Sequence, residues 1–116
     1  MENSEFSIAS IHRLVDLVDY VSGAVVVKAI MNKKTGSVTV SAFDMGEELQ
    51  TGPSAFDCLI QIIDGEAEIV IGDNLQNMLT GEILIIPAHV KNRVRAKTRF
   101  KMLSTIIKSG YEDISL

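Results

Sequence analysis

Short runs of β-branched and other apolar residues dominate the chain from Ala24 onward, and they limit what it can fold into. The runs span 24–30, 38–43, 59–63, 67–71, 83–86 and 102–107. Turn-forming residues stand between them at 32–36, 64–65, 72–74 and 80–81. This spacing favours antiparallel hairpins over strand–helix–strand units. The sequence therefore predicts an all-β fold, a small jelly-roll β-barrel.

One segment ahead of these runs has the spacing of an amphipathic helix. The apolar residues at helical spacing are Ile11, Leu14, Val15 and Val18. Ser10 stands before them and can cap the first turn. We expect one short N-terminal helix that packs over an end or an edge of the barrel.

Length and composition limit the domain organisation and the partners. The chain has 116 residues, 47% of them hydrophobic, which is enough for one core but not for two. We expect a single domain over residues 1–116, with the barrel core at about 22–108. No apolar stretch approaches the roughly 18 residues of a membrane span, and the start of the sequence lacks a signal-peptide pattern. With a net charge of −4 and one cysteine, Cys58, we expect a cytoplasmic protein without membrane or nucleic-acid partners.

Two segments marked by glycine and proline resemble the motifs of a known family. The first runs from Gly46 to Gly65, and the second runs from Gly81 through Pro87 to Asn92. In their spacing the two segments resemble the paired motifs of the cupin superfamily. The resemblance covers about half of the chain. The resemblance implies an RmlC-like jelly-roll barrel in a small, single-domain form.

The resemblance also locates the positions at which cupins hold a metal ion. The two histidines of the first motif fall on Gly52 and Ser54, and its glutamate falls on Cys58. The histidine of the second motif falls on Asn92, and its glycine falls on His89. All four ligand positions have changed. Because glycine has no donor and serine and asparagine are weak ligands, we expect neither a metal ion nor another cofactor.

Only two histidines remain for a rearranged site. His12 lies outside both motifs, and we expect it at the surface. His89 lies near the barrel mouth, where a displaced metal site would join it with Asp57 and Cys58. Adjacent residues of a strand point to opposite faces, so Asp57 and Cys58 are not expected to reach one ion. A metal-free acid–base reaction through His89 is a further alternative, and we assign no catalytic residue.

The changed positions still face the barrel interior if the motif register holds. Strand alternation from Cys58 then places Ile60 inside and Leu59 outside. The predicted ligand pocket comprises Gly52, Ser54, Cys58, Ile60, His89 and Asn92. An apolar cavity with a few neutral hydrogen-bonding groups is typical of a small-molecule site. We therefore expect a metal-free cupin that binds or senses a small molecule, with a cupin enzyme as the alternative.

Apolar residues also fall on the outer face of the barrel. Leu59 and Ile63 would meet water there unless another surface covers them, and small cupins commonly form dimers. We expect a homodimer. The alternative is a monomer in which the N-terminal helix and the termini cover both residues.

Basic residues occupy every odd position from Lys91 to Lys101. The pattern predicts either a strip that binds an anion or an acidic partner, or a solvated strand face that prevents edge-to-edge aggregation. A turn near residues 96–98 would divide the strip between two strands.

Overall fold

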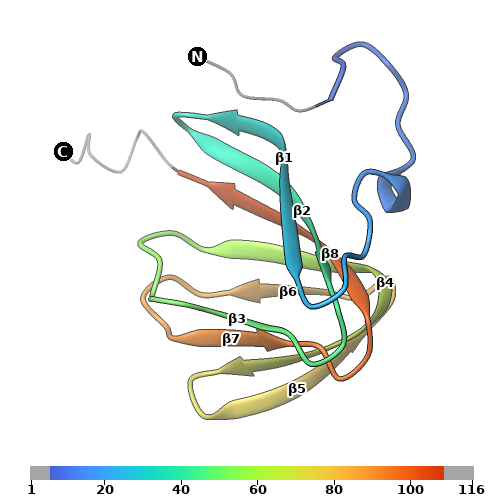
Figure 1. Ribbon diagram of the computed structural model, residues 1–116. Coiled ribbons are helices and arrows are strands. Elements are labelled where there is room, and N and C mark those ends of the chain that lie inside the picture. Colours follow the sequence, from blue (N-terminus) through green and yellow to red (C-terminus); the bar gives the residue numbers. More distant parts are fainter. Residues whose placement is uncertain (1–5, 109–116) are drawn as a thin grey trace, which may run out of the picture.

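The computed structural model describes residues 6–108 and confirms the all-β prediction. This part of the chain forms eight strands and one 3-10 turn, and Figure 1 shows the strands in a curled jelly roll. The elements are η1 (Leu14–Asp16), β1 (Val25–Lys33), β2 (Gly36–Phe43), β3 (Glu48–Thr51), β4 (Cys58–Ile71), β5 (Asn74–Leu79), β6 (Ile83–Ile86), β7 (Asn92–Arg95) and β8 (Phe100–Ile107). Within residues 6–108, no helix has both the length and the apolar character needed to cross a membrane.

Strand β4 belongs to both halves of the curled sheet (Figure 1). Its first part, up to residue 65, pairs with β6 and β8, and β2 and then β1 follow beyond β8. We call this the β8 half. Its second part, residues 66–71, pairs with β5 and β7, and β3 follows beyond β7. We call this the β7 half. One long strand therefore joins the two halves that enclose the interior.

The bend of β4 lies at Gly65. The pairing of β4 with β8 shifts in register between Ile62 and Asp64, and Gly65 has a φ angle of 76°. A Cβ atom at Gly65 would lie 2.2 Å from the carbonyl oxygen of Arg99, so a side chain does not fit there. The prediction of a hairpin turn at residues 64–65 is wrong, because these residues form an irregularity within one continuous strand.

The main core lies between the two halves. Phe43 and Phe100 stack with their ring centroids 4.4 Å apart, and both side chains are fully buried. Ile60, Ile62 and Ile69 of β4 belong to the same buried cluster. Because Ile60 and Ile62 precede the bend and Ile69 follows it, β4 contributes to the core from both of its parts.

A second, smaller core lies under the N-terminal segment. Val18 is buried there against Val40 and Ala42 of β2, and Ile63 packs against the same cluster. Figure 1 shows the N-terminal segment outside the sheet, beside the β8 half. Ile63 is therefore covered by its own chain, whereas Leu59 stays 38% exposed. Of the two residues expected on the outer face, the chain's own N-terminal segment thus covers Ile63 and leaves Leu59 partly exposed.

The N-terminal helix is a single 3-10 turn, Leu14–Asp16, and is shorter than the apolar spacing predicts. Ser10 and Ile11 lie outside it, and Ile11 is fully exposed. The Lys101 ammonium donates a hydrogen bond to the Val15 carbonyl at 2.5 Å. A longer helix would need this carbonyl for its own hydrogen bonds. Tertiary contact with β8 therefore competes with extension of the helix.

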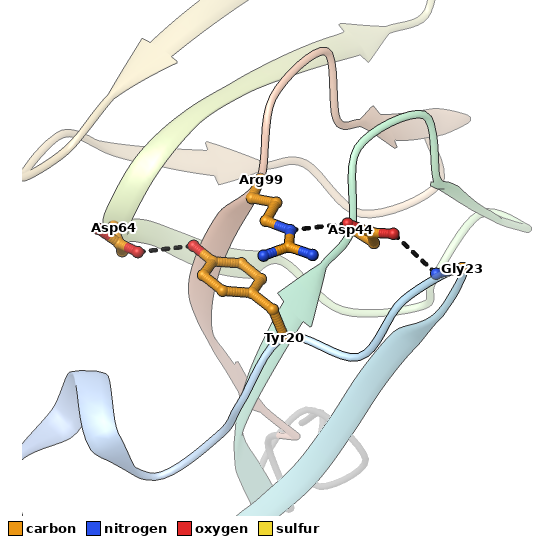
Figure 2. Close-up of polar contacts among 5 residues, drawn as sticks. All are labelled: Tyr20, Gly23, Asp44, Asp64 and Arg99. Atoms are coloured by element: carbon orange, nitrogen blue, oxygen red, sulfur yellow. Dashed lines mark hydrogen bonds and ion pairs between the residues drawn. The ribbon is translucent and has the colours of Figure 1, made fainter.

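Polar contacts anchor the segment that follows η1 (Figure 2). The Tyr20 hydroxyl donates to Asp64 Oδ2 at 2.6 Å. The Gly23 N–H and the Arg99 guanidinium donate to the two carboxylate oxygens of Asp44, at 2.7 and 2.8 Å. The guanidinium also lies 5.3 Å from the centroid of the Tyr20 ring. Burial and the hydrogen bond to Asp64 raise the pKa of Tyr20, so its hydroxyl keeps its proton.

The basic strip is divided between the two halves by a bend at residues 97–98. Arg95 and Lys97 reach the buried carboxylate of Glu68, at 3.8 and 2.9 Å. Arg99 and Lys101 instead contact the N-terminal segment. These four cations serve contacts within the chain. Their arrangement therefore fits cations that are paired within the chain better than a continuous anion-binding strip.

We predict that Asp44→Asn lowers the stability of the fold at neutral pH and reduces its sensitivity to acid. The Gly23 N–H and then the Arg99 guanidinium lower the pKa of Asp44 to about 2, from an ordinary value of 3.8. The stability that this carboxylate contributes is complete above about pH 5 and is lost as the pH falls toward 2. Urea midpoints of wild type and variant will differ most at pH 7, and the gap will narrow to roughly half by pH 3.

Asp19→Asn is the matched control, because it removes an exposed carboxylate one residue before Tyr20. Its urea midpoint will follow the wild type at every pH. A gap between wild type and Asp44→Asn that stays constant from pH 7 to pH 3 would contradict the assignment.

Candidate functional site

The interior of the barrel contains a cavity of about 250 Å³. Strands from both halves line it, together with the segment before β4. The wall is mostly apolar and includes Phe56, Ile60, Val94 and Met102. Its polar members are Thr39, Ser54, Cys58, Asn92 and Ser104. Aspartate, glutamate, lysine, arginine and histidine are absent from the residues that line this cavity.

Four of the six predicted pocket residues line this cavity. They are Ser54, Cys58, Ile60 and Asn92. The other two, Gly52 and His89, do not line it. Both are exposed, Gly52 between β3 and β4 and His89 in the loop after β6. The structure thus gathers three of the four positions at which the cupin motifs carry metal ligands, and it leaves the position of Gly52 outside the wall.

Two hydroxyl residues of the cavity, Thr39 and Ser104, are not predicted from the sequence. Thr39 of β2 pairs with Ser104 of β8, and Ser104 pairs in turn with Ile60 of β4. Residues that are paired across neighbouring strands share a face of the sheet, so all three point inward. Only the strand pairing, which joins distant parts of the sequence, reveals the two hydroxyls.

Two loops meet at the rim of the cavity and are joined by hydrogen bonds. The His89 N–H donates to the Ser54 carbonyl at 2.7 Å. The Ala88 N–H donates to Asp57 Oδ1 at 2.8 Å. Asp57 therefore binds the backbone of the facing loop and lies outside the cavity wall, as does His89. The alternative metal site of His89, Asp57 and Cys58 is not assembled, because only Cys58 faces the cavity.

The polar groups of the cavity do not fit a metal ion. Burial raises the pKa of the Cys58 thiol, and a hydrogen bond with the backbone of Thr105 opposes this only in part. Ser54 Oγ already accepts the N–H of Phe56 at 3.0 Å. Transition-metal sites rely on imidazole or thiolate donors, and neutral thiol, hydroxyl and amide groups are poor substitutes. Across residues 6–108, no three His, Cys, Asp or Glu side chains gather closely enough to hold an ion.

No protein-family model and no curated protein matches this chain. Solved structures match over most of its length. A protein of unknown function from Streptococcus pyogenes superposes with a TM-score of 0.84 and 23% identity, over 90% of this chain and 91% of that one. A cupin superfamily protein from Desulfitobacterium hafniense gives a TM-score of 0.79 and 26% identity, over 83% and 88%. An RmlC-like cupin from Desulfovibrio desulfuricans gives 0.75 and 25%, over 85% and 96%.

These likenesses agree with the fold described above. The match from Streptococcus pyogenes supports the fold alone. The two other structures are cupins, and this chain covers 88% and 96% of their lengths. They do not assign a ligand or a reaction. The paired motifs, the jelly roll and the solved structures together place the chain in the cupin superfamily.

Proposed function

We propose that this cupin is a metal-free module that binds or senses a small molecule in its interior cavity. The observation that carries the proposal is a cavity of about 250 Å³ in which the ligand positions of the cupin motifs hold Ser54, Cys58 and Asn92. The cavity retains a few hydrogen-bonding groups on an apolar wall, which is the usual composition of a small-molecule site. The lone cysteine is compatible with a reducing cytoplasm.

An acid–base enzyme that uses His89 has less support. His89 is exposed on the rim and does not line the cavity. A general base must come within hydrogen-bonding reach of the substrate proton. A substrate held in the cavity would therefore need a rearranged loop before it could react with this imidazole.

We predict that tag-free protein, purified without chelator, contains far less than one metal ion per chain by plasma mass spectrometry. Chelator treatment will leave its melting temperature unchanged, because no metal contributes to the folded state. The positive control is the triple variant Ser54→His, Cys58→Glu and Asn92→His, which places ligands at the three positions on the cavity wall. Calorimetry will detect Zn²⁺ binding to this variant only. A near-stoichiometric metal in the wild type would refute the proposal.

The backbone of His89 has an unusual conformation, and its strain can be tested. Its φ angle is 66°, in the left-handed region, at the position where the cupin motif has glycine. We predict that His89→Gly stabilises the protein by about 0.5–1 kcal/mol, because relief of the φ penalty exceeds the entropy that glycine adds to the unfolded chain. Urea unfolding measures the change.

His89→Ala is the matched control, since it removes the same imidazole but keeps a Cβ at the left-handed φ. It will give no stabilisation. If His89→Ala stabilised the protein as much as His89→Gly, the imidazole and not the backbone would be the source of the strain, and a role for the side chain would regain support.

We also propose that the protein is a homodimer. An outer patch of exposed apolar residues on the β8 half supports this, comprising Leu59, Ile83, Ile85 and Ile107. Leu59, Ile85 and Ile107 border an outer concavity of about 370 Å³. The four side chains are apolar, so a contact between two copies would remove them from water.

We predict that Ile85→Asp shifts the protein from the mass of two chains to the mass of one in light scattering after size exclusion. A carboxylate in an apolar contact loses its water without gaining a partner. Leu75→Asp is the control, because Leu75 is similarly exposed, 55% against 61%, but lies on β5 in the other half. A wild-type protein with the mass of one chain would refute the dimer.

A further inference from the structure

We infer that the interior cavity takes an uncharged, compact and mainly apolar molecule that carries a hydroxyl or carbonyl oxygen. This inference rests on the proposed function and adds the chemical class of the ligand. Three properties of the cavity lead to it: the absence of charge on its wall, its volume and the donors that its polar groups offer.

The absence of charge on the cavity wall disfavours ionised ligands. The residues that line the cavity carry no formal charge. Cys58 is the only ionisable member of the lining, and burial favours its neutral thiol. An ionised carboxylate, phosphate or ammonium that entered the cavity would lose its water and gain no opposite charge. A neutral molecule avoids this penalty.

The volume limits the ligand to a small molecule. An engineered apolar cavity of about 150 Å³ binds benzene, which gives a scale for comparison. The present cavity, at about 250 Å³, has room for a six-membered ring with a short substituent. Drug-sized ligands usually occupy pockets of about 300–1,000 Å³, so this cavity lies below that range.

The polar groups favour an oxygen acceptor on the ligand. Ser54 Oγ accepts the Phe56 N–H, so its own hydroxyl hydrogen can be donated inward. Thr39 and Ser104 place two further hydroxyls on the cavity wall, on paired strands. Asn92 Nδ2 lies 3.5 Å from the Val90 carbonyl, at the long limit of a hydrogen bond, and its amide carries two hydrogens. These donors suit a hydroxyl or carbonyl oxygen.

Three probes of similar size and different charge test the inference. Benzyl alcohol is neutral, benzoate is an anion and benzylammonium is a cation at pH 7. Each is titrated into uniformly ¹⁵N-labelled protein, and amide shifts are followed by NMR. We expect saturable shifts of the Ile60 and Ser104 amides with benzyl alcohol, and affinities at least about tenfold lower for both ions.

Matched variants locate the binding site of the probes. Ser104→Phe fills the cavity and will abolish binding of benzyl alcohol. Thr105→Phe changes the next residue of β8, which faces the outer concavity, and will leave binding intact. The ¹⁵N spectra report whether each variant is folded. If Ser104→Phe does not fold, Ile106→Phe fills the same cavity from a neighbouring position.

The outcomes separate the inference from the proposed function. If benzoate or benzylammonium binds as tightly as benzyl alcohol and Ser104→Phe abolishes that binding, the cavity is a binding site but the neutral class is wrong. If no probe binds, or if Thr105→Phe and not Ser104→Phe abolishes binding, the inference and the proposed cavity site both fail.

Discussion

The bend of β4 at Gly65 is the constraint on which the rest of the structure depends. A straight β4 could not pair with β6 and β8 in one half and with β5 and β7 in the other, and the interior would stay open. The position also lies against the carbonyl of Arg99. Arg99 directly precedes β8, and its side chain reaches Asp44 and Tyr20. One glycine therefore affects both the enclosure of the core and the attachment of the N-terminal segment.

The charged side chains of the barrel lie outside the cavity wall. Charged side chains form pairs elsewhere in the structure, such as Lys97 with Glu68 and Arg99 with Asp44. The hydrogen bond from Lys97 lowers the pKa of Glu68, so this largely buried carboxylate stays ionised beside its partner. The cavity wall receives hydroxyl, thiol and amide groups instead. Such a wall can orient a ligand by hydrogen bonds.

The sequence predicts the strands in which apolar residues predominate, and it misses β3, β5 and β7, in which at least half of the residues are polar. β5 and β7 bury only Met78 and Val94, and the remaining residues of both strands are polar or exposed. A single inward residue gives no periodic pattern for sequence reasoning to detect. The opposite error occurs at Asp64 and Gly65. Their composition is typical of a turn, but pairing with β8 on both sides of the irregularity keeps the strand continuous.

The candidate site is predictable as far as the two motifs reach. Gly65 and Gly81 have φ angles of 76° and 91°, so the bend and the turn fix where residues at a set distance, such as Cys58 and Asn92, can fall. Thr39 and Ser104 lie outside the motifs, and their orientation depends on the pairing of β2 with β8. The motifs therefore locate the part of the cavity at which other cupins hold a metal ion. The neutral hydrogen-bonding wall is complete only when distant strands add their hydroxyls, and for that reason the character of the ligand follows from the structure and not from the motif.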